Sequence, residues 1–294
     1  MIPVWLNRRE YPFTVHTFDT LDGRMSYVDE GEGRPILFLH GNMTWSYLYR
    51  DLVLEFSEER RCIAPDMLGF GLSDKPAKAD YSGMAHAQRL DAFIEHLELE
   101  DFTLFLHDYG GPIGIEWLIQ NRSRVRDVIV SDTWMWSQNE HGRAQRLAKI
   151  YANPINRLYY HSLRASPRFF MPPLLADANM MPRNMLDQFL MPFENTSERE
   201  GPYSMATGLI KESTWFDSLW QRRSLIRDVP ALVLWGTRDE MRMSWELERW
   251  QQVFPFSTQA ELPDVGGLGP LQVWDDCARE MRMFFQTEEA MRGI

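Results

Sequence analysis

The sequence predicts an α/β fold in which a mostly parallel sheet is covered by helices on both faces. Short apolar runs of strand length alternate with segments whose apolar residues recur at helical spacing. The length of 294 residues suits one large domain, or one domain that carries an insertion. With 44% apolar and 25% charged residues, the composition is that of a globular protein and argues against a disordered chain.

Eight runs with strand-like composition are the candidate strands of this sheet. They lie at residues 13–19, 24–29, 35–40, 61–64, 102–107, 125–131, 231–235 and 258–262. The first two runs are close enough in sequence to pair as a hairpin, whereas helix-like segments separate most of the later ones. These segments lie at 46–56, 84–97, 111–121, 244–254 and 272–285. We therefore expect an eight-stranded sheet built mainly from strand–helix–strand units.

The strand pattern is interrupted between residues 134 and 227. This stretch contains helix-like and loop-like segments broken by prolines, and a clear strand pattern resumes at Ala231. We expect a core domain formed by residues 1–133 and 228–294, with residues 134–227 inserted as a helical cap. The inserted stretch is rich in methionine and aromatic residues, which suit an adaptable apolar lining. The alternative is that these side chains only pack between the cap and the sheet. We expect a small apolar molecule as the substrate.

Composition also excludes several classes of function. The formal net charge of −11 opposes a nucleic-acid-binding face, and no apolar run is long enough to span a membrane. The first residues lack the pattern of a secretion signal, so we expect a cytoplasmic protein with Cys62 and Cys277 as free thiols. We expect no metal and no organic cofactor, because no ligand cluster or phosphate-binding loop is present. Nothing in the sequence predicts an oligomeric state.

The strongest local signal for chemistry is the run LFLHDYGGPIG at residues 104–114. It reads as an apolar strand, a sharp glycine-rich turn and then a helix, which is the form of a nucleophile elbow. Asp108 occupies the apex of this turn. An ionised carboxylate at that place suits attack on an alkyl carbon, which would give an alkyl ester of the enzyme. The alternative is that Asp108 caps a helix that begins near Gly111.

Two further motifs follow predicted strands, HGNMTWS at 40–46 and PDMLGFGLSDKP at 65–76. The ends of parallel strands meet at one edge of a sheet, so the first motif should face the same site as Asp108. Together the three motifs resemble the haloalkane dehalogenase family of α/β-hydrolases. Members of that family show an HGNPT-like turn, a D-x-x-G-x-G-x-S-D-K-P loop and an HDWGG-like elbow. The resemblance spans nearly the whole chain, including the cap.

The resemblance implies roles for individual residues. Asp108 would be the nucleophile, and the side chains of Asn42 and Tyr109 would hold the leaving halide or an equivalent anion. Asp132 matches one placement of the triad acid in this family, and Asp239 matches the other. Each of these two residues comes just after a predicted strand. For both, the alternative is a loop aspartate that accepts hydrogen bonds from backbone N–H groups.

Two departures from the family pattern bear on activity. Tyr109 stands where these dehalogenases place a tryptophan, whose indole N–H stabilises the halide. Gly267 stands where they have the histidine that activates water to hydrolyse the ester. All seven histidines lie upstream of the last two predicted strands, so no neighbour in sequence replaces this base. His40 and His107 adjoin motif turns, where we expect them to serve packing and hydrogen bonding.

Three explanations for Gly267 remain open at this point. The base was deleted by design to trap the covalent intermediate, or the enzyme naturally performs a step that needs no base. One such step is ring opening of a β-lactone by Asp108 followed by loss of carbon dioxide, as expected for a β-lactone decarboxylase branch that residues 248–255 resemble. In the third explanation, the protein only binds an apolar ligand. The leading hypothesis is a haloalkane dehalogenase-like hydrolase with an aspartate nucleophile and no base for ester hydrolysis.

Overall fold

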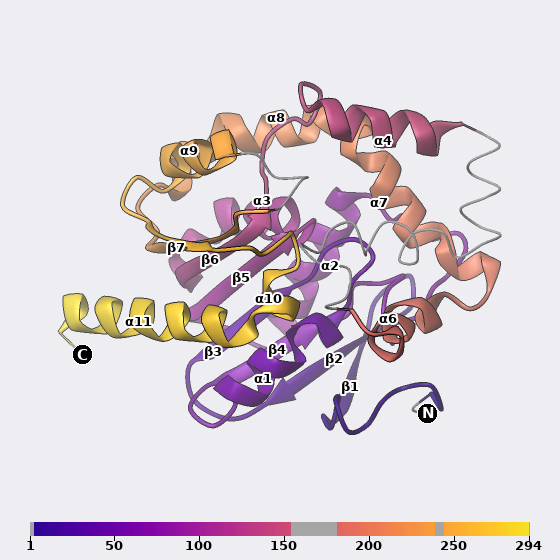
Figure 1. Ribbon diagram of the computed structural model, residues 1–294, viewed down its shortest axis with the longest axis horizontal. Helices are drawn as coiled ribbons and strands as arrows, with labels where there is room; N and C mark the ends of the chain where they lie inside the picture. Colours follow the sequence, from indigo (N-terminus) through magenta and orange to yellow (C-terminus); the bar gives the residue numbers. More distant parts are fainter. Residues whose placement is uncertain (1–2, 154–180, 239–243, 294) are drawn as a thin grey trace.

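A computed structural model describes residues 3–153, 181–238 and 244–293, and its centre is one eight-stranded sheet (Figure 1). The strand order is β1-β2-β4-β3-β5-β6-β7-β8. The bounds are Val15–Asp19 for β1, Arg24–Glu30 for β2, Pro35–Leu39 for β3, Arg61–Pro65 for β4, Phe102–Asp108 for β5, Val125–Thr133 for β6, Ala231–Gly236 for β7 and Thr258–Leu262 for β8. Strand β2 pairs antiparallel with β1 and β4, and all other pairs are parallel. The predicted α/β fold and its mostly parallel sheet are confirmed.

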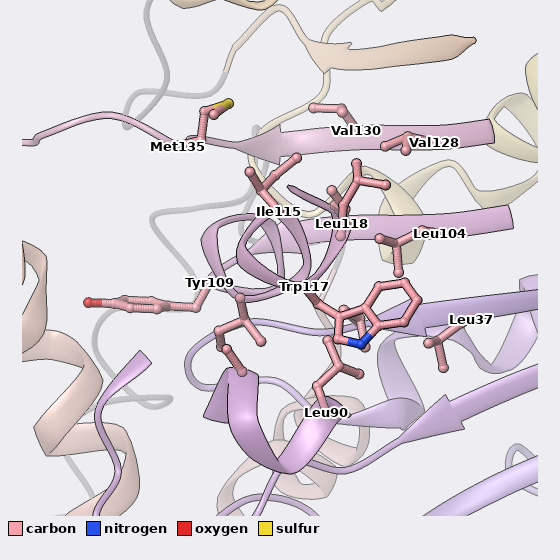
Figure 2. Packing of buried hydrophobic residues seen from close by; sticks show 14 of the residues in the cluster. Leu37, Leu90, Leu104, Tyr109, Ile115, Trp117, Leu118, Val128, Val130 and Met135 are labelled. Carbon is pink, nitrogen blue, oxygen red and sulfur yellow. The ribbon is translucent and has the colours of Figure 1, made fainter. Parts of the chain in front are cut away.

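Helices cover both faces of the sheet because successive strand residues point to opposite sides. Leu104 and Leu106 of β5 belong to a core shared with α2 (Gly83–His96) and α3 (Gly110–Gln120). Phe105, between those two leucines, belongs to a core on the opposite face. Helices α1 (Arg50–Phe56) and α11 (Trp274–Arg292) contribute most of the helical residues of that opposite core. Figure 2 shows the first core, with Trp117 of α3 lying near Leu90 and Leu37.

Two predicted helices differ in detail from the structure. The segment predicted at 46–56 begins with a 3-10 turn, Ser46–Tyr49, before α1 starts. The segment predicted at 272–285 is divided into α10 (Gly269–Gln272) and α11. The division falls at Val273, whose φ of −139° and ψ of 52° are not helical. Helix α11 then continues to Arg292, where Gly293 ends it in the left-handed conformation.

The described residues between β6 and β7 form helices, and we call residues 134–227 the cap segment. Its described helices are α4 (Gly142–Ala152), α6 (Arg183–Leu190), α7 (Glu200–Lys211) and α8 (Ser213–Arg222). Short 3-10 turns lie between α6 and α7 and directly after α8. Helix α9 (Ser244–Val253) follows β7. Figure 1 shows α4, α7 and α8 lying above and beside the sheet. The division into a core and a separate cap domain stays a prediction, and residues 154–180 within it lie outside the described part.

Two further properties of the described residues bear on the expected class of protein. No helix within the described ranges is both long enough and apolar enough to cross a bilayer. Cys62 and Cys277 are buried and carry no disulfide, as expected. Both belong to the core between the sheet and helices α1 and α11.

Candidate active site

Asp108 is the last residue of β5 and has a strained backbone. Its φ is 47°, which is uncommon for a residue other than glycine. The next residue, Tyr109, is the N-cap of α3 and makes no side-chain cap hydrogen bond. The carboxylate of Asp108 instead reaches the loop after β3, where its Oδ2 accepts a hydrogen bond of 2.7 Å from the backbone N–H of Asn42. Strand, strained apex and helix therefore form the elbow that the sequence predicts.

Close approach to the carboxylate explains the glycine before Asn42. A Cβ atom at Gly41 would lie 2.2 Å from Oδ2 of Asp108. Gly111 is confined in a similar way, since its Cβ would lie 1.8 Å from the Thr133 hydroxyl oxygen. That hydroxyl donates a hydrogen bond to the backbone carbonyl of Asp108. The two glycines thus leave room for the carboxylate and for the side chain that holds its backbone.

Asp132 lies on the neighbouring strand and has a similar conformation, with φ of 45°. It is buried, and its Oδ1 accepts a hydrogen bond of 3.1 Å from the backbone N–H of Gly236 at the end of β7. The hydroxyl of Ser131 donates to Oδ2 at 3.2 Å. The predicted acid is thus at the same edge of the sheet as Asp108, and it also accepts from backbone N–H as the alternative supposed. Asp239, the other predicted acid, lies outside the described residues.

Gly267 is buried in the segment between β8 and α10, and its backbone contacts His107. The carbonyl oxygen of Gly267 lies 2.9 Å from Nε2 of His107. A carbonyl only accepts hydrogen bonds, so this contact assigns the hydrogen to Nε2. The residue before Asp108 is therefore joined to the position at which the resembling family would place its base.

His40 is held in a neutral form by contacts on both ring nitrogens. Its Nδ1 donates to the carbonyl of Gly41 at 2.8 Å, and its Nε2 accepts from the N–H of Met67 at 2.9 Å. Burial lowers the pKa of His40 to about 4. The ring thus connects the loops after β3 and β4. His40 and His107 both make the hydrogen bonds that the sequence predicts for them.

The two predicted anion-binding side chains both contact helix α7 of the cap segment. The amide of Asn42 donates to the carbonyl of Pro202 at 3.3 Å, and the hydroxyl of Tyr109 donates to the carbonyl of Met205 at 2.7 Å. The Tyr109 ring packs edge-on against Trp134 with the centroids 5.0 Å apart. Figure 2 shows this ring directed away from the packed residues of α3. A phenol has a single hydrogen to donate, whereas the Asn42 amide has two.

Residues 34–269 match the family model described as alpha/beta hydrolase fold. The chain belongs to the α/β-hydrolase family. Haloalkane dehalogenase 2 of Mycobacterium tuberculosis is 32% identical over 259 residues, which cover 87% of this chain and 89% of the relative. The cis-3-alkyl-4-alkyloxetan-2-one decarboxylase of Xanthomonas campestris is 31% identical over 260 residues, covering 78% of this chain and 81% of the relative. Both groups to which the sequence motifs point are therefore homologues of this α/β-hydrolase.

Solved structures give the same fold. Haloalkane dehalogenase DbeA from Bradyrhizobium elkani superposes with a TM-score of 0.86 at 19% identity, covering 95% of this chain and 99% of that one. Haloalkane dehalogenase DatA from Agrobacterium tumefaciens superposes with a TM-score of 0.84 at 21% identity, covering 94% and 97%. At these identities the likeness shows the fold alone.

The structure of this α/β-hydrolase also brings in residues that sequence reasoning missed. Thr133 binds the backbone of Asp108, and the signal for it was a hydroxyl residue directly after a candidate acid at a strand end. The carbonyls of Pro202 and Met205 carry no side-chain signal, so no motif could have shown them. Asp66 holds its loop by accepting from the N–H groups of Ser46 and Leu72, and burial raises its pKa to about 6. Within the described ranges, no group of three or more potential ligands is placed to hold a metal.

Proposed function

We propose that this α/β-hydrolase is a haloalkane dehalogenase-like enzyme in which Asp108 attacks the carbon of a small apolar substrate. One observation carries the proposal. The carboxylate at the strained end of β5 is oriented by the N–H of Asn42 at 2.7 Å, with Gly41 leaving space beside it. A carboxylate is a weak nucleophile, but holding it in the correct orientation against an alkyl carbon raises the rate of attack.

The first step balances without any proton transfer. A carboxylate oxygen of Asp108 forms a bond to the alkyl carbon, and the carbon–halogen bond breaks with its electron pair going to the halide. The products are an alkyl ester of Asp108 and a halide anion. Asn42 has an amide hydrogen beyond the one that Pro202 receives, and Tyr109 would have to release Met205 to donate to the same anion.

Hydrolysis of the ester is the step at which this enzyme should stop. Water must be deprotonated as it attacks the ester carbonyl, and glycine at position 267 offers no side chain for that task. Asp132 or Asp239 would act as the acid that orients a base in the resembling family. With glycine at position 267, neither aspartate has a side chain at that position to orient. We therefore expect the alkyl-enzyme to accumulate.

Intact-protein mass spectrometry tests this function directly. The protein is incubated with a panel of primary bromoalkanes, with Asp108→Asn treated in parallel as a variant of nearly the same shape. The expected result is an added alkyl mass in the parent and none in the variant. An adduct of the same size in Asp108→Asn would show that the nucleophile is misassigned.

A second candidate function is that of a β-lactone decarboxylase-type lyase, favoured by the homologous decarboxylase and by the missing base. Asp108 would attack the saturated ring carbon that is bonded to the ring oxygen, and the bond between these two atoms would break. The product is an ester of Asp108 that carries a free carboxylate. Loss of carbon dioxide would then expel the Asp108 carboxylate and form an alkene, so neither water nor a base is needed. Release of carbon dioxide from a β-lactone tests this function. If neither an adduct nor carbon dioxide appears, the remaining function is non-covalent binding of an apolar ligand.

A further inference from the structure

The two aspartates at the ends of β5 and β6 are linked through one side chain. Asp108 and Asp132 have nearly the same left-handed φ, 47° and 45°, and Thr133 follows the second and binds the backbone of the first. We propose that Thr133 is a positioning residue that holds Asp108 in its attacking conformation. This inference rests on the proposed function of Asp108 as the nucleophile.

A bulge between β5 and β6 creates this arrangement. The pairing runs from His107 opposite Ser131 directly to Asp108 opposite Thr133, so the register passes over Asp132. Such a bulge turns the extra residue out of the ladder, and here the Asp132 carboxylate reaches Gly236 of β7. The same bulge advances Thr133 by one position, which brings its hydroxyl to the carbonyl of Asp108. The bulge therefore determines both the contact of Asp132 with β7 and the hydrogen bond from Thr133 to Asp108.

Thr133 is fixed from several sides. It is fully buried, and its own carbonyl accepts a hydrogen bond of 3.0 Å from the indole N–H of Trp250. Its hydroxyl lies against Gly111, where any Cβ would collide with it. A side chain held in this way cannot follow Asp108 if the strand end moves. The hydroxyl is therefore a fixed donor for the Asp108 carbonyl.

Loss of this hydroxyl should relax the backbone of Asp108. Its carbonyl would lose a buried hydrogen bond that offsets the strain of the left-handed conformation. A change in φ at Asp108 swings the side chain, so Oδ2 would leave the N–H of Asn42. Misplacement of a reacting group by about 1 Å can cost roughly a hundredfold in rate.

The test compares three variants of the full chain. Thr133→Val removes the hydroxyl and keeps the shape, whereas Thr133→Ser keeps the hydroxyl. Thr103→Val is the matched control, because Thr103 is equally buried and lies at the opposite end of β5. Adduct formation with a primary bromoalkane is followed by mass against substrate concentration, well below the unfolding temperature of each variant.

The expected result is a fall of roughly tenfold to a hundredfold in the maximal alkylation rate of Thr133→Val, with an unchanged half-saturating concentration. Thr133→Ser should recover most of that rate, and Thr103→Val should alkylate like the parent. An unaltered rate in Thr133→Val, or an equal loss in Thr103→Val, would overturn the proposal.

A crystal structure of Thr133→Val separates this proposal from the proposed function. If the parent forms no adduct, the proposed role of Asp108 as the nucleophile is wrong, but the crystal structure still shows the position of its carboxylate. The expected structure shows Oδ2 of Asp108 moved away from the N–H of Asn42. Retention of the 2.7 Å contact would refute a positioning role for Thr133.

Discussion

The position of the Asp108 carboxylate depends on the glycine at position 41 as much as on the groups that form hydrogen bonds with Asp108. The carboxylate occupies the space into which any side chain at position 41 would project. Its left-handed φ is also uncommon for a residue other than glycine, so the surrounding contacts help to hold it there. Small changes around this residue should therefore act on reactivity and stability together.

Gly41→Ala should slow the alkylation of Asp108 strongly and lower the stability of the fold. The new methyl group would lie 2.2 Å from Oδ2, so either the carboxylate or the loop after β3 must move. We expect at least a hundredfold loss in the rate of adduct formation, measured by intact mass. Gly142→Ala is the control, since a Cβ there meets nothing within 4 Å. Alkylation of Gly41→Ala at the parent rate would show that the carboxylate does not react from this position.

Gly267→His should restore turnover. The backbone contact between the Gly267 carbonyl and His107 does not depend on a side chain, so the substitution can add a base without removing that contact. Halide release should change from a single equivalent to many, and added imidazole should give a weaker rescue of the parent. Gly267→Gln supplies a polar side chain that is not a base and should stay at one equivalent. No gain in a folded Gly267→His variant would mean that the rest of the site has diverged as well.

Individual site residues differed in how far the sequence could place them. Asp108 and Asn42 stand in motifs whose chemistry and position after strands are visible without a structure, and the structure joins them at 2.7 Å. For Thr133 the sequence offered only a hydroxyl residue directly after a candidate acid; its hydrogen bond to Asp108 depends on a shift of register between β5 and β6. A one-residue shift changes which atoms face each other but leaves the alternation of apolar residues intact.

At the scale of elements, helix α8 is fastened to helix α3 by a buried carboxylate. Glu116 accepts hydrogen bonds from Arg222 and Trp215, both on α8, at 2.7 Å and 2.9 Å. Burial alone would raise the pKa of Glu116, but these hydrogen bonds outweigh it and the pKa is lowered. The cap segment therefore rests on the core through a charged contact as well as an apolar one.

Arg222→Met should destabilise the protein by about 2 kcal/mol at pH 7, measured by urea unfolding. It leaves the Glu116 carboxylate without its positive partner. A carboxylate whose pKa is lowered in the folded state stabilises the fold at pH values above its unfolded-state pKa. This stabilisation is lost as the pH falls through its folded-state pKa. The difference between variant and parent should thus shrink below about pH 4. Arg279→Met, which removes an exposed pair on α11, should leave the unfolding curve unchanged. An equal effect at pH 3 and pH 7 would contradict a charge-based role.

The elements themselves were largely predictable because their apolar periodicity survives in the sequence. All eight strands lie within two residues of their predicted bounds. The break between α10 and α11 was missed, since Val273 lies in an otherwise helical pattern, although its φ of −139° and ψ of 52° are not helical. The contacts of α7 with Asn42 and Tyr109 could not be predicted from the sequence either. It uses backbone carbonyls, which every residue type possesses.

At the scale of the whole molecule, a buried acid lies at the opposite end of the strands from the site. Asp127 is near the start of β6, whereas the site is at the carboxyl ends of the strands. Burial raises the pKa of Asp127 to about 6, although Arg292, Arg60 and Arg126 oppose the shift. The folded protein therefore holds this proton more tightly than the unfolded chain does.

Asp127→Asn should increase stability at pH 8 relative to the parent. Where the folded-state pKa is raised, the free energy of unfolding falls as the pH rises from about 4 to about 6 and stays lower above it. The neutral amide avoids this loss, so the variant should gain about 1 to 3 kcal/mol at pH 8 and nothing at pH 4. Thermal unfolding across this pH range measures the difference. A constant offset between the two proteins would assign the effect to hydrogen bonding instead of charge.

The neighbouring positions of β6 and β7 have a consequence for how this enzyme can be altered. The cap segment leaves the sheet at the end of one strand and returns to the strand beside it, where Val128 pairs with Ala231. Asn42, Asp108, Asp132 and Thr133 all precede this excursion in the chain. The contacts that α7 makes with Asn42 and Tyr109 come from main-chain carbonyls, which a helix of different sequence can reproduce. We therefore expect that the corresponding segment of a homologue can replace this one while the residues at the ends of β3, β5 and β6 stay unchanged.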